Sequence, residues 1–116
     1  MQLLLVADST WVLNDVAASL PSDDWSINHA DPRSVVEAAI ADPPNAVLVD
    51  MQVGSMGGMA VIRALRDAIA MGKVKAVPLI LMLDRRVDQF IADRAGADRS
   101  LLKPFTAQAL RKALAG

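Results

Sequence analysis

The chain has 116 residues, the size of one ordinary domain that buries roughly two-thirds of its unfolded surface in a single core. Hydrophobic residues make up 53% and charged residues 22%, a balance typical of globular rather than disordered proteins. No apolar run approaches the ~18 residues that a membrane span requires, so a soluble protein is expected. With no cysteine and a single histidine, the chain excludes disulfides, thiolate nucleophiles, cysteine-ligated zinc and clusters of histidine ligands.

The net charge of −1 conceals an uneven distribution of charge along the chain. Residues 1–50 carry eight acidic side chains against Arg33 alone, a balance of −7, whereas residues 51–83 and 84–116 each sum to +3. The acidic part can supply carboxylates to a hard cation. The basic balance elsewhere is too small for a nucleic-acid footprint, and aromatic residues at 3% offer few stacking platforms, so direct nucleic-acid binding is not expected.

In the first half of the chain, apolar runs alternate with segments of helical periodicity. Residues 3–7 form a continuous apolar run that ends at Asp8, as expected of a strand covered on both faces. The next segment predicts a helix capped by Ser9 or Thr10, with an apolar face made of Val12, Val16 and Leu20. Residues 25–29 alternate as a half-exposed edge strand does. A second helix follows and stops at the prolines, with an apolar face made of Val35, Val36, Ala39 and Ile40.

The same alternation continues to the end of the chain. Residues 46–49 are a second buried run that ends at Asp50, followed by a glycine-containing loop and a third helix with a stripe made of Val61, Ile62, Leu65 and Ile69. Residues 77–83 predict a fourth strand, with Pro78 tolerable only near its start. A short fifth strand contains Leu101 and Leu102. The helices on either side of it are indicated by the spacing of Val87, Phe90, Ile91 and Ala95, and of Ala107, Leu110 and Leu114.

Five strands alternating with five helices predict a doubly wound α/β domain with a parallel sheet covered on both sides, because each parallel connection needs a crossover. The site of such a domain lies beyond the carboxyl ends of its strands, where this chain has Asp8, Asp50, Leu83, Asp84 and Lys103. Carboxylates there can hold Mg²⁺, which also accepts phosphate oxygens, while the lysine balances a phosphoryl group. The alternative is that the acids cap turns and the lysine is a solvated surface charge. Three charges at the exits of one sheet edge favour a site.

Near the end of the chain stands a specific motif. Residues 96–98 read Gly-Ala-Asp and are followed, after four residues, by Lys103-Pro104-Phe105. With Asp8, Asp50 and the loop over residues 52–58, this motif makes the chain resemble the receiver domain of bacterial response regulators over its whole length, residues 1–116. The resemblance implies a single domain with a flavodoxin-like, three-layer (βα)5 fold and a five-stranded sheet in the order 2-1-3-4-5.

The resemblance also implies a role for each site residue. Asp50 is the phosphoacceptor, which takes a phosphoryl group from the phosphohistidine of a partner kinase. Asp8 and Asp50, with the backbone carbonyl of Gln52, bind the Mg²⁺ cofactor, and Lys103 pairs with the phosphorylated carboxylate. The family usually has a cis peptide bond between the residues matching Lys103 and Pro104, where such a bond costs least.

Four positions depart from the pattern of the family. Ala7 replaces the first of two adjacent acids, which lowers the expected affinity for metal. The switch positions are also altered: Leu83 stands where a hydroxyl residue bonds the phosphoryl group, Asp84 where a small residue is usual, and Ser100 where an aromatic changes rotamer. Moving a two-state element from 1:99 to 99:1 needs about 5.5 kcal/mol, and a hydrogen bond to a charged group contributes roughly 1.5–3 kcal/mol. Losing the hydroxyl therefore removes up to about half of the free energy that such a switch needs.

Asp84 adds a further expectation for the switch. Its carboxylate opposes a phosphoryl group of about −1.5 to −2 charges, unless it turns outward or pairs with Arg85 or Arg86. The leading hypothesis is therefore a two-component phosphorelay receiver with weakened switching, which is not itself an enzyme. The alternative is a degenerate receiver that acts as an interaction module without phosphorylation. A small hydrolase lacks support, because no histidine, cysteine or activated serine is available as nucleophile or base.

The expected partners are a histidine kinase or phosphotransfer protein, and a homodimer or output partner on the last third of the chain. The basic residues there either form that surface or are solvated helix faces: Arg85, Arg86, Arg94, Arg99, Arg111 and Lys112. Nothing at the start reads as a signal peptide, which favours the cytoplasm without a membrane partner. A stand-alone regulator and a receiver with an output domain beyond Gly116 both stay open. Trp11 and Trp25 are expected to pack near the sheet edge, and His29 to lie on an edge strand without a catalytic role.

Overall fold

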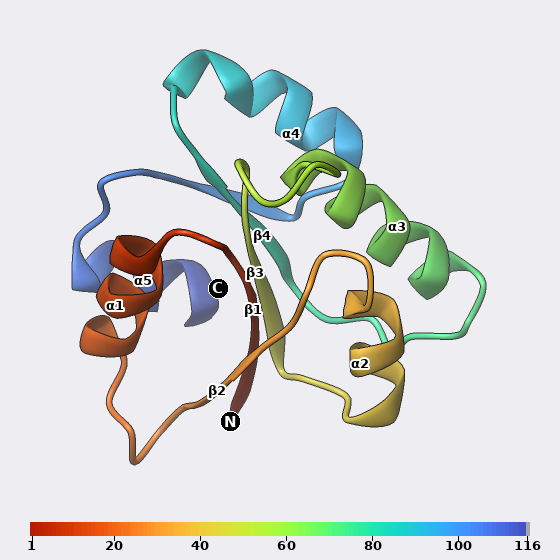
Figure 1. Cartoon of the computed structure of the whole chain (residues 1–116), viewed down its shortest axis with the longest axis horizontal. Coiled ribbons are helices and arrows are strands. Elements are labelled where there is room, and N and C mark those ends of the chain that lie inside the picture. The colour runs from red at the N-terminus through yellow and green to blue at the C-terminus, as the bar shows by residue number, and fades with distance from the viewer. Residues whose placement is uncertain (116) are drawn as a thin grey trace.

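The computed structural model describes residues 1–115, and Gly116, the last residue of the expected domain, lies outside them. Five parallel strands form one sheet in the order β2-β1-β3-β4-β5, with bounds β1 Gln2–Val6, β2 Ser26–His29, β3 Ala46–Asp50, β4 Leu79–Leu83 and β5 Arg99–Leu102. The helices are α1 Thr10–Ser19, α2 Val35–Ala41, α3 Gly58–Ala70, α4 Gln89–Ala95 and α5 Ala107–Ala115. The predicted doubly wound flavodoxin-like fold and its strand order are confirmed (Figure 1).

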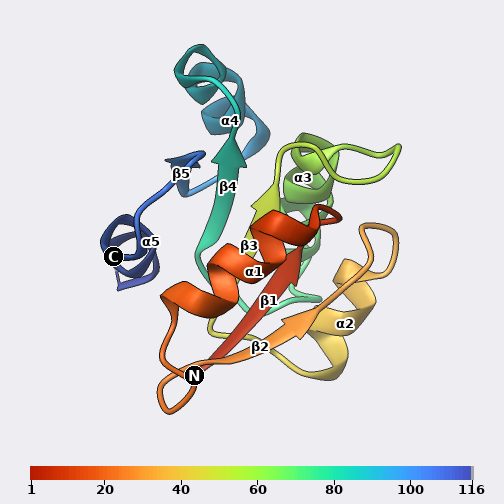
Figure 2. The same cartoon turned by 60° about the vertical axis from the view of Figure 1, so that its left-hand side comes forward.

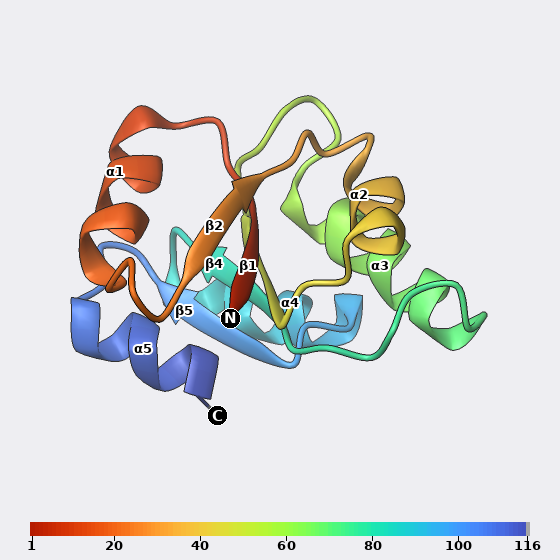
Figure 3. The same ribbon diagram turned by 90° about the horizontal axis from the view of Figure 1, so that it is seen from below.

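Both faces of the sheet are buried, because apolar side chains alternate between two cores. In β3, Val47 and Val49 face one core while Ala46 and Leu48 face the other. Helices α1 and α5 cover one face, and α2, α3 and α4 cover the opposite face (Figures 1 and 3). Three layers result, as expected of a sheet whose central strands β1, β3 and β4 are almost wholly apolar.

Local signals near α1 and β4 behave partly as predicted. Ser9 is the N-cap of α1 through its carbonyl, which accepts from the Leu13 N–H at 3.1 Å, but its side chain makes no capping hydrogen bond. Pro78 lies just before β4 rather than within it, and its carbonyl accepts from the Val47 N–H at 3.0 Å. A proline cannot donate to the ladder but can still accept, so the strand begins one residue later.

The apolar residues that predict the fourth helix are not the ones that it buries. A 3-10 turn over Arg86–Asp88 leads into α4, and Val87, Phe90 and Ile91 are 73%, 67% and 51% exposed. The buried positions of α4 are Ala92 and Ala95, which face the core shared with α3. Helix α4 stands at the end of the sheet beyond β4, where few neighbours cover its outer side (Figure 2). Periodicity reports which residues share a face, but the neighbours decide which face is covered.

No helix within residues 1–115 has the length and apolar character needed to cross a bilayer. The longest helix of this part of the chain, α3, has 13 residues, against the roughly 20 that a span requires.

Candidate functional site

Strand register brings the chemically active residues to one edge of the sheet. Asp50 is the last residue of β3 and lies opposite Met82, while Leu83 at the end of β4 lies opposite Leu102. The chain therefore leaves β3, β4 and β5 side by side, and the next residues of β4 and β5 are Asp84 and Lys103. The backbone continues this pairing, because the Lys103 N–H donates to the Leu83 carbonyl at 2.8 Å.

Lys103 is the centre of the site. Its Nζ donates to Asp50 Oδ1 at 2.5 Å and lies 2.8 Å from Asp84 Oδ1. The side chains of Asp50 and Lys103 are 2% and 7% exposed, whereas that of Asp84 is 34% exposed. A second, longer hydrogen bond reaches Asp50 Oδ1 from the Gln52 N–H at 3.4 Å. One ammonium is thus shared by a buried carboxylate and a partly exposed one.

The position of Asp84 differs from both expected arrangements. It neither turns outward nor pairs with a neighbouring arginine, but binds Lys103. Arg85 pairs instead with Asp88 at 3.1 Å, one helical turn away. This i,i+3 pair engages the Arg85 guanidinium locally, while Asp84 pairs with the lysine that follows β5.

The two acids also set the pKa of Lys103. Burial is the largest effect and lowers this pKa, but the hydrogen bonds and negative charges of Asp50 and Asp84 together outweigh it. The net result is a pKa above the ordinary value of 10.5. The ammonium therefore stays charged at neutral pH, as a counter-ion to two carboxylates must.

This raised pKa predicts how the stability of the fold depends on alkaline pH. A group whose pKa is higher in the folded chain than in the unfolded chain stabilises the folded chain. The stabilisation is full at a pH below the pKa in the unfolded chain, near 10.5, and is lost as the pH rises through the pKa in the folded chain. We expect the free energy of unfolding of wild type to exceed that of Lys103→Met by a constant amount between about pH 7 and about pH 9.5. The difference shrinks at higher pH. Urea unfolding across this range checks the trend, and a difference that widened with alkalinity would contradict it.

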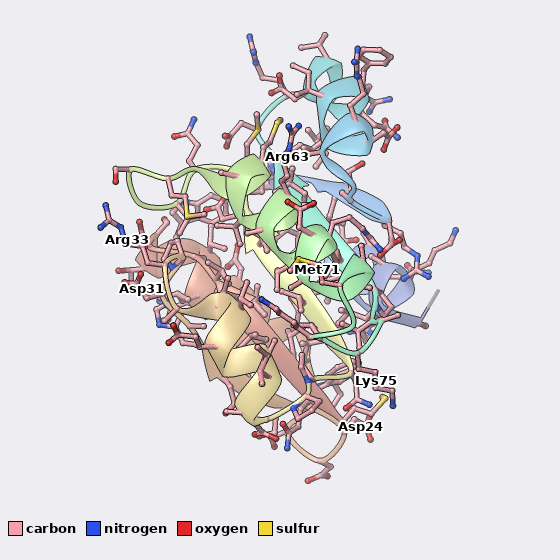
Figure 4. The ribbon with its side chains drawn as sticks, turned by 90° about the vertical axis from the view of Figure 1, so that its right-hand side faces the viewer. Asp24, Asp31, Arg33, Arg63, Met71 and Lys75 are labelled. Atoms are coloured by element: carbon pink, nitrogen blue, oxygen red, sulfur yellow. The ribbon has the colours of Figure 1, made fainter. Side chains whose placement is uncertain are left out.

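Asp8 lies at the same end of the sheet but is engaged by the loop after β3. Its Oδ2 accepts from the Gly54 N–H at 2.5 Å. Asp8 also lines a hollow between this loop and the loop after β2, together with Asp31, Arg33 and Ser55. Asp31 and Arg33 project near this loop in Figure 4. Asp8 thus fixes the loop next to Asp50.

Comparison with solved structures gives matches over nearly the whole chain, although no family model matches it. The chemotaxis protein CheY4 of Vibrio cholerae has a TM-score of 0.82 at 22% identity, over 98% of this chain and 95% of that one. A second match is the receiver domain of a sensor histidine kinase from Pseudomonas aeruginosa, solved with a magnesium ion coordinated in its active-site cleft. It has a TM-score of 0.81 at 24% identity, over 97% of this chain and 93% of that one. This chain has the receiver-domain fold.

A curated relative points in the same direction. The response regulator MprA of Mycolicibacterium vanbaalenii is 28% identical over 111 residues, which are 95% of this chain and 47% of that protein. The chain thus spans about half the length of the curated relative it matches. In the structure of this chain Asp50, Asp84 and Lys103 lie together at the ends of β3, β4 and β5, and the Lys103–Pro104 bond is cis.

The donor set of this receiver fold suits a magnesium ion. Within residues 1–115 no group of three or more His, Cys, Asp or Glu side chains is placed to hold a metal. Magnesium needs no such cage, because it is commonly bound through one or two carboxylates and keeps several waters. Asp8 comes two residues after the end of β1, and Asp50 ends the neighbouring strand β3, where Val6 pairs with Val49. Gln52 comes two residues after Asp50. Two carboxylates and one carbonyl are the hard oxygen donors that this cation prefers.

The side chains of the other two switch positions, Leu83 and Ser100, make no hydrogen bond to Lys103 within residues 1–115. Leu83 is 2% exposed and belongs to the core beneath α3 and α4. Ser100 is partly exposed on β5, where it lines a hollow together with Leu83, Arg86, Gln89 and Leu102. A serine in place of a large side chain leaves this space between β5 and α4 unfilled. Leu83 offers no hydrogen-bond donor at the end of β4.

Trp11 joins the site, which the sequence analysis does not predict. Its side chain is 47% exposed on the first turn of α1 rather than packed at the sheet edge, and Lys103 Nζ lies 5.9 Å from its ring centroid. Trp25, in contrast, packs against the core beneath α1 and α5. The sequence carries no signal for this contact, because the path of α1, which begins at Thr10, brings the ring of residue 11 to a lysine far along the chain.

Several basic residues of the last third are bound within the chain rather than held ready for a partner. Arg99 donates to the Ala113 carbonyl at 2.7 Å, and Arg111 donates to the Ser19 carbonyl at 3.2 Å. Arg94 lies 5.7 Å from the ring centroid of Phe90. The arginines therefore join β5 and α5 to their neighbours as well as charging this surface. His29 lies on β2, where its Nε2 is 2.7 Å from the Ala7 carbonyl.

Proposed function

We propose that this chain is a receiver of two-component signalling that accepts a phosphoryl group on Asp50. The observation that carries the proposal is the buried carboxylate at the end of β3 with a buried lysine 2.5 Å away. Burying an ion pair so far from water costs desolvation energy, so its presence points to a functional role for the charges. Strand exits are also where a doubly wound sheet binds ligands. The fold of CheY4 and of the magnesium-bound kinase receiver supports the same assignment.

The transfer step follows from the free oxygen of Asp50. Among the described residues, both hydrogen bonds to this carboxylate go to Oδ1, which leaves Oδ2 as the nucleophile. Oδ2 forms a bond to phosphorus while the P–N bond of a donor phosphohistidine breaks. The electron pair of that bond leaves with the imidazole nitrogen of a phosphohistidine that is protonated on its other ring nitrogen, so the products are an aspartyl phosphate and a neutral histidine. Positioning and charge stabilisation, rather than covalent chemistry by other side chains, would supply the catalysis.

In this proposal Asp8, Asp50 and the carbonyl of Gln52 hold Mg²⁺. The bound ion would neutralise charge on the oxygens of the transferred group. Lys103, which already donates to Asp50, is placed to bind an oxygen of the same group. Ala7 is buried and supplies no second carboxylate beside Asp8, so we expect weak metal binding.

The partners belong to the same proposal. A histidine kinase or a phosphotransfer protein donates the phosphoryl group, and an output partner or a second copy reads α4, β5 and α5. Neither nucleic acid nor membrane takes part, and the domain acts in the cytoplasm. Leu83 gives the aspartyl phosphate no hydroxyl donor, so the response is expected to be weaker than a full switch.

A second candidate is a receiver fold that binds partners without phosphorylation. It is favoured by the contacts of Lys103, because Asp84 already pairs with the ammonium that a phosphoryl group would need as its counter-ion. It is also favoured by the exposed apolar residues Val87, Phe90 and Ile91, which leave a binding surface at α4 in the unmodified chain. The two candidates differ in whether Asp50 reacts.

Intact-mass measurement after incubation with phosphoramidate and Mg²⁺ tests the assignment. Wild type is expected to gain one phosphoryl group, and Asp50→Asn none. Asp93→Asn is the matched control, because it removes the same charge from an exposed position on α4 and should behave as wild type. Phosphoryl uptake that persists in Asp50→Asn would show that another residue is the acceptor. A folded wild type that takes up none would favour the second candidate.

A further inference from the structure

Two carboxylates already engage the ammonium of Lys103, which is where a phosphoryl oxygen would bind. An ammonium has three N–H donors and no acceptor. Asp50 Oδ1 at 2.5 Å and Asp84 Oδ1 at 2.8 Å take two of them, and the indole of Trp11 lies 5.9 Å from Nζ. A phosphoryl oxygen that binds the remaining donor would share the ammonium with two negatively charged carboxylates, and one of these has to give way.

We propose that Asp84 competes with a phosphoryl group on Asp50 for Lys103. In this proposal Asp84 has to leave the lysine before the phosphoryl group can bind Lys103. The inference rests on the proposed function and adds a regulatory residue to that site. Asp84 would thereby set how readily the pocket accepts and holds a phosphoryl group.

Exposure identifies Asp84 as the neighbour that moves. The Asp50 side chain is 2% exposed and sits within a central strand, so breaking its ion pair would leave a buried charge without a partner. Asp84 is 34% exposed and follows β4, where it can rotate into water. A partly hydrated carboxylate loses little when its ion pair is broken.

Like charge makes the competition stronger than a simple exchange of hydrogen bonds. A phosphoryl group on Asp50 brings about −1.5 to −2 charges next to the lysine, and a carboxylate left in place would repel it. Arg85, adjacent in sequence, is held by Asp88 and so does not draw Asp84 away in the unmodified chain. The resting structure therefore favours Asp84 on Lys103, and the modified state favours its departure.

The test is the affinity for beryllofluoride, a phosphoryl mimic, in the presence of Mg²⁺. Trp11 reports on the site because its ring lies beside Lys103, and a Trp25→Phe background removes the second tryptophan. Asp84→Asn keeps the shape of the side chain without its charge, and is expected to bind beryllofluoride about tenfold more tightly than the background protein. Asp84→Ala should show the same direction. Asp93→Asn, the exposed control on α4, should match the background.

The outcomes separate this inference from the function on which it rests. If the background protein and Asp84→Asn bind equally well and Asp50→Asn binds nothing, the pocket works and Asp84 does not compete. Weaker binding by both Asp84 variants would mean that Asp84 assists the phosphoryl site, which also overturns the inference. If neither the background protein nor Asp84→Asn binds, the proposed function fails and the inference fails with it. Circular dichroism of each variant verifies that it is folded.

Discussion

Lys103→Met is expected to lower the free energy of unfolding by about 3 kcal/mol. Methionine has a similar length, so it fills the space of the lysine stem, but it cannot neutralise the Asp50 carboxylate, which is 2% exposed. Removing one partner of a buried ion pair costs about 3–5 kcal/mol, because the other charge stays buried and unpaired. The low end applies here because Asp84, the second acid, is 34% exposed and can be hydrated. Urea unfolding followed by far-ultraviolet circular dichroism measures the loss.

A double variant separates the effect of the orphaned charge from that of lost packing. Lys103→Met with Asp50→Asn removes both charges of the buried pair and is expected to recover most of the lost stability. Asp50→Asn alone leaves Lys103 its contact with Asp84 and should cost less than Lys103→Met. Equal stability of Lys103→Met and wild type would mean that water reaches Asp50 more easily than the contacts of this pair imply.

Gly58→Ala is expected to destabilise the fold by about 1–3 kcal/mol and to disturb the position of Asp50. Gly58 is the first residue of α3, and its N–H donates to the Met51 carbonyl at 2.9 Å. A Cβ at this position would lie 2.7 Å from Met51 Cα and would also collide with the carbonyl of Asp50. These obstacles are backbone atoms of the segment that carries the carboxylate. The helix can therefore accept the methyl group only by moving away from Asp50.

Gly72→Ala provides the comparison, because its φ of 75° is also unfavourable for alanine while nothing lies within 4 Å of the added Cβ. That variant should cost about 1 kcal/mol from backbone conformation alone. Amide chemical shifts distinguish the two: shifts at Asp50 and Lys103 are expected in Gly58→Ala and not in Gly72→Ala. If both variants shift these signals equally, the close approach at Gly58 is not what positions Asp50.

Most of the fold could be predicted from the sequence, because its strands are short apolar runs and its helices have a clear period. The exits of these strands could be predicted for the same reason: parallel strands all end at one edge, so Asp50 and Lys103 had to come near each other. The exposed face of α4 could not be predicted. Phe90 and Ile91 have the spacing of a buried stripe, but Ala92 and Ala95 are the residues that meet the core.

The direction of Asp84 is the clearest example within the site. Its position after β4 is evident from the sequence, which offers Arg85 and Arg86 as partners but not Lys103. The choice of Lys103 depends on Arg85 being taken by Asp88 and on the distance between the ends of β4 and β5. Trp11 shows the same limit, because only the path of α1 over the sheet brings its ring to Lys103. Gly58 is a third example, since the approach of α3 to Asp50 leaves no mark on the local pattern.

The sequence by itself determined the alternation of strands and helices, the two buried faces of the sheet, and the three charged residues at its exits. These features depend on hydrophobic period and chain connectivity, which are local properties. The tertiary structure decided which acid shares the lysine, which side of α4 meets water, and how closely α3 approaches Asp50. Such features depend on distances between elements far apart in the chain, and a side chain selects its partner only once those distances are set.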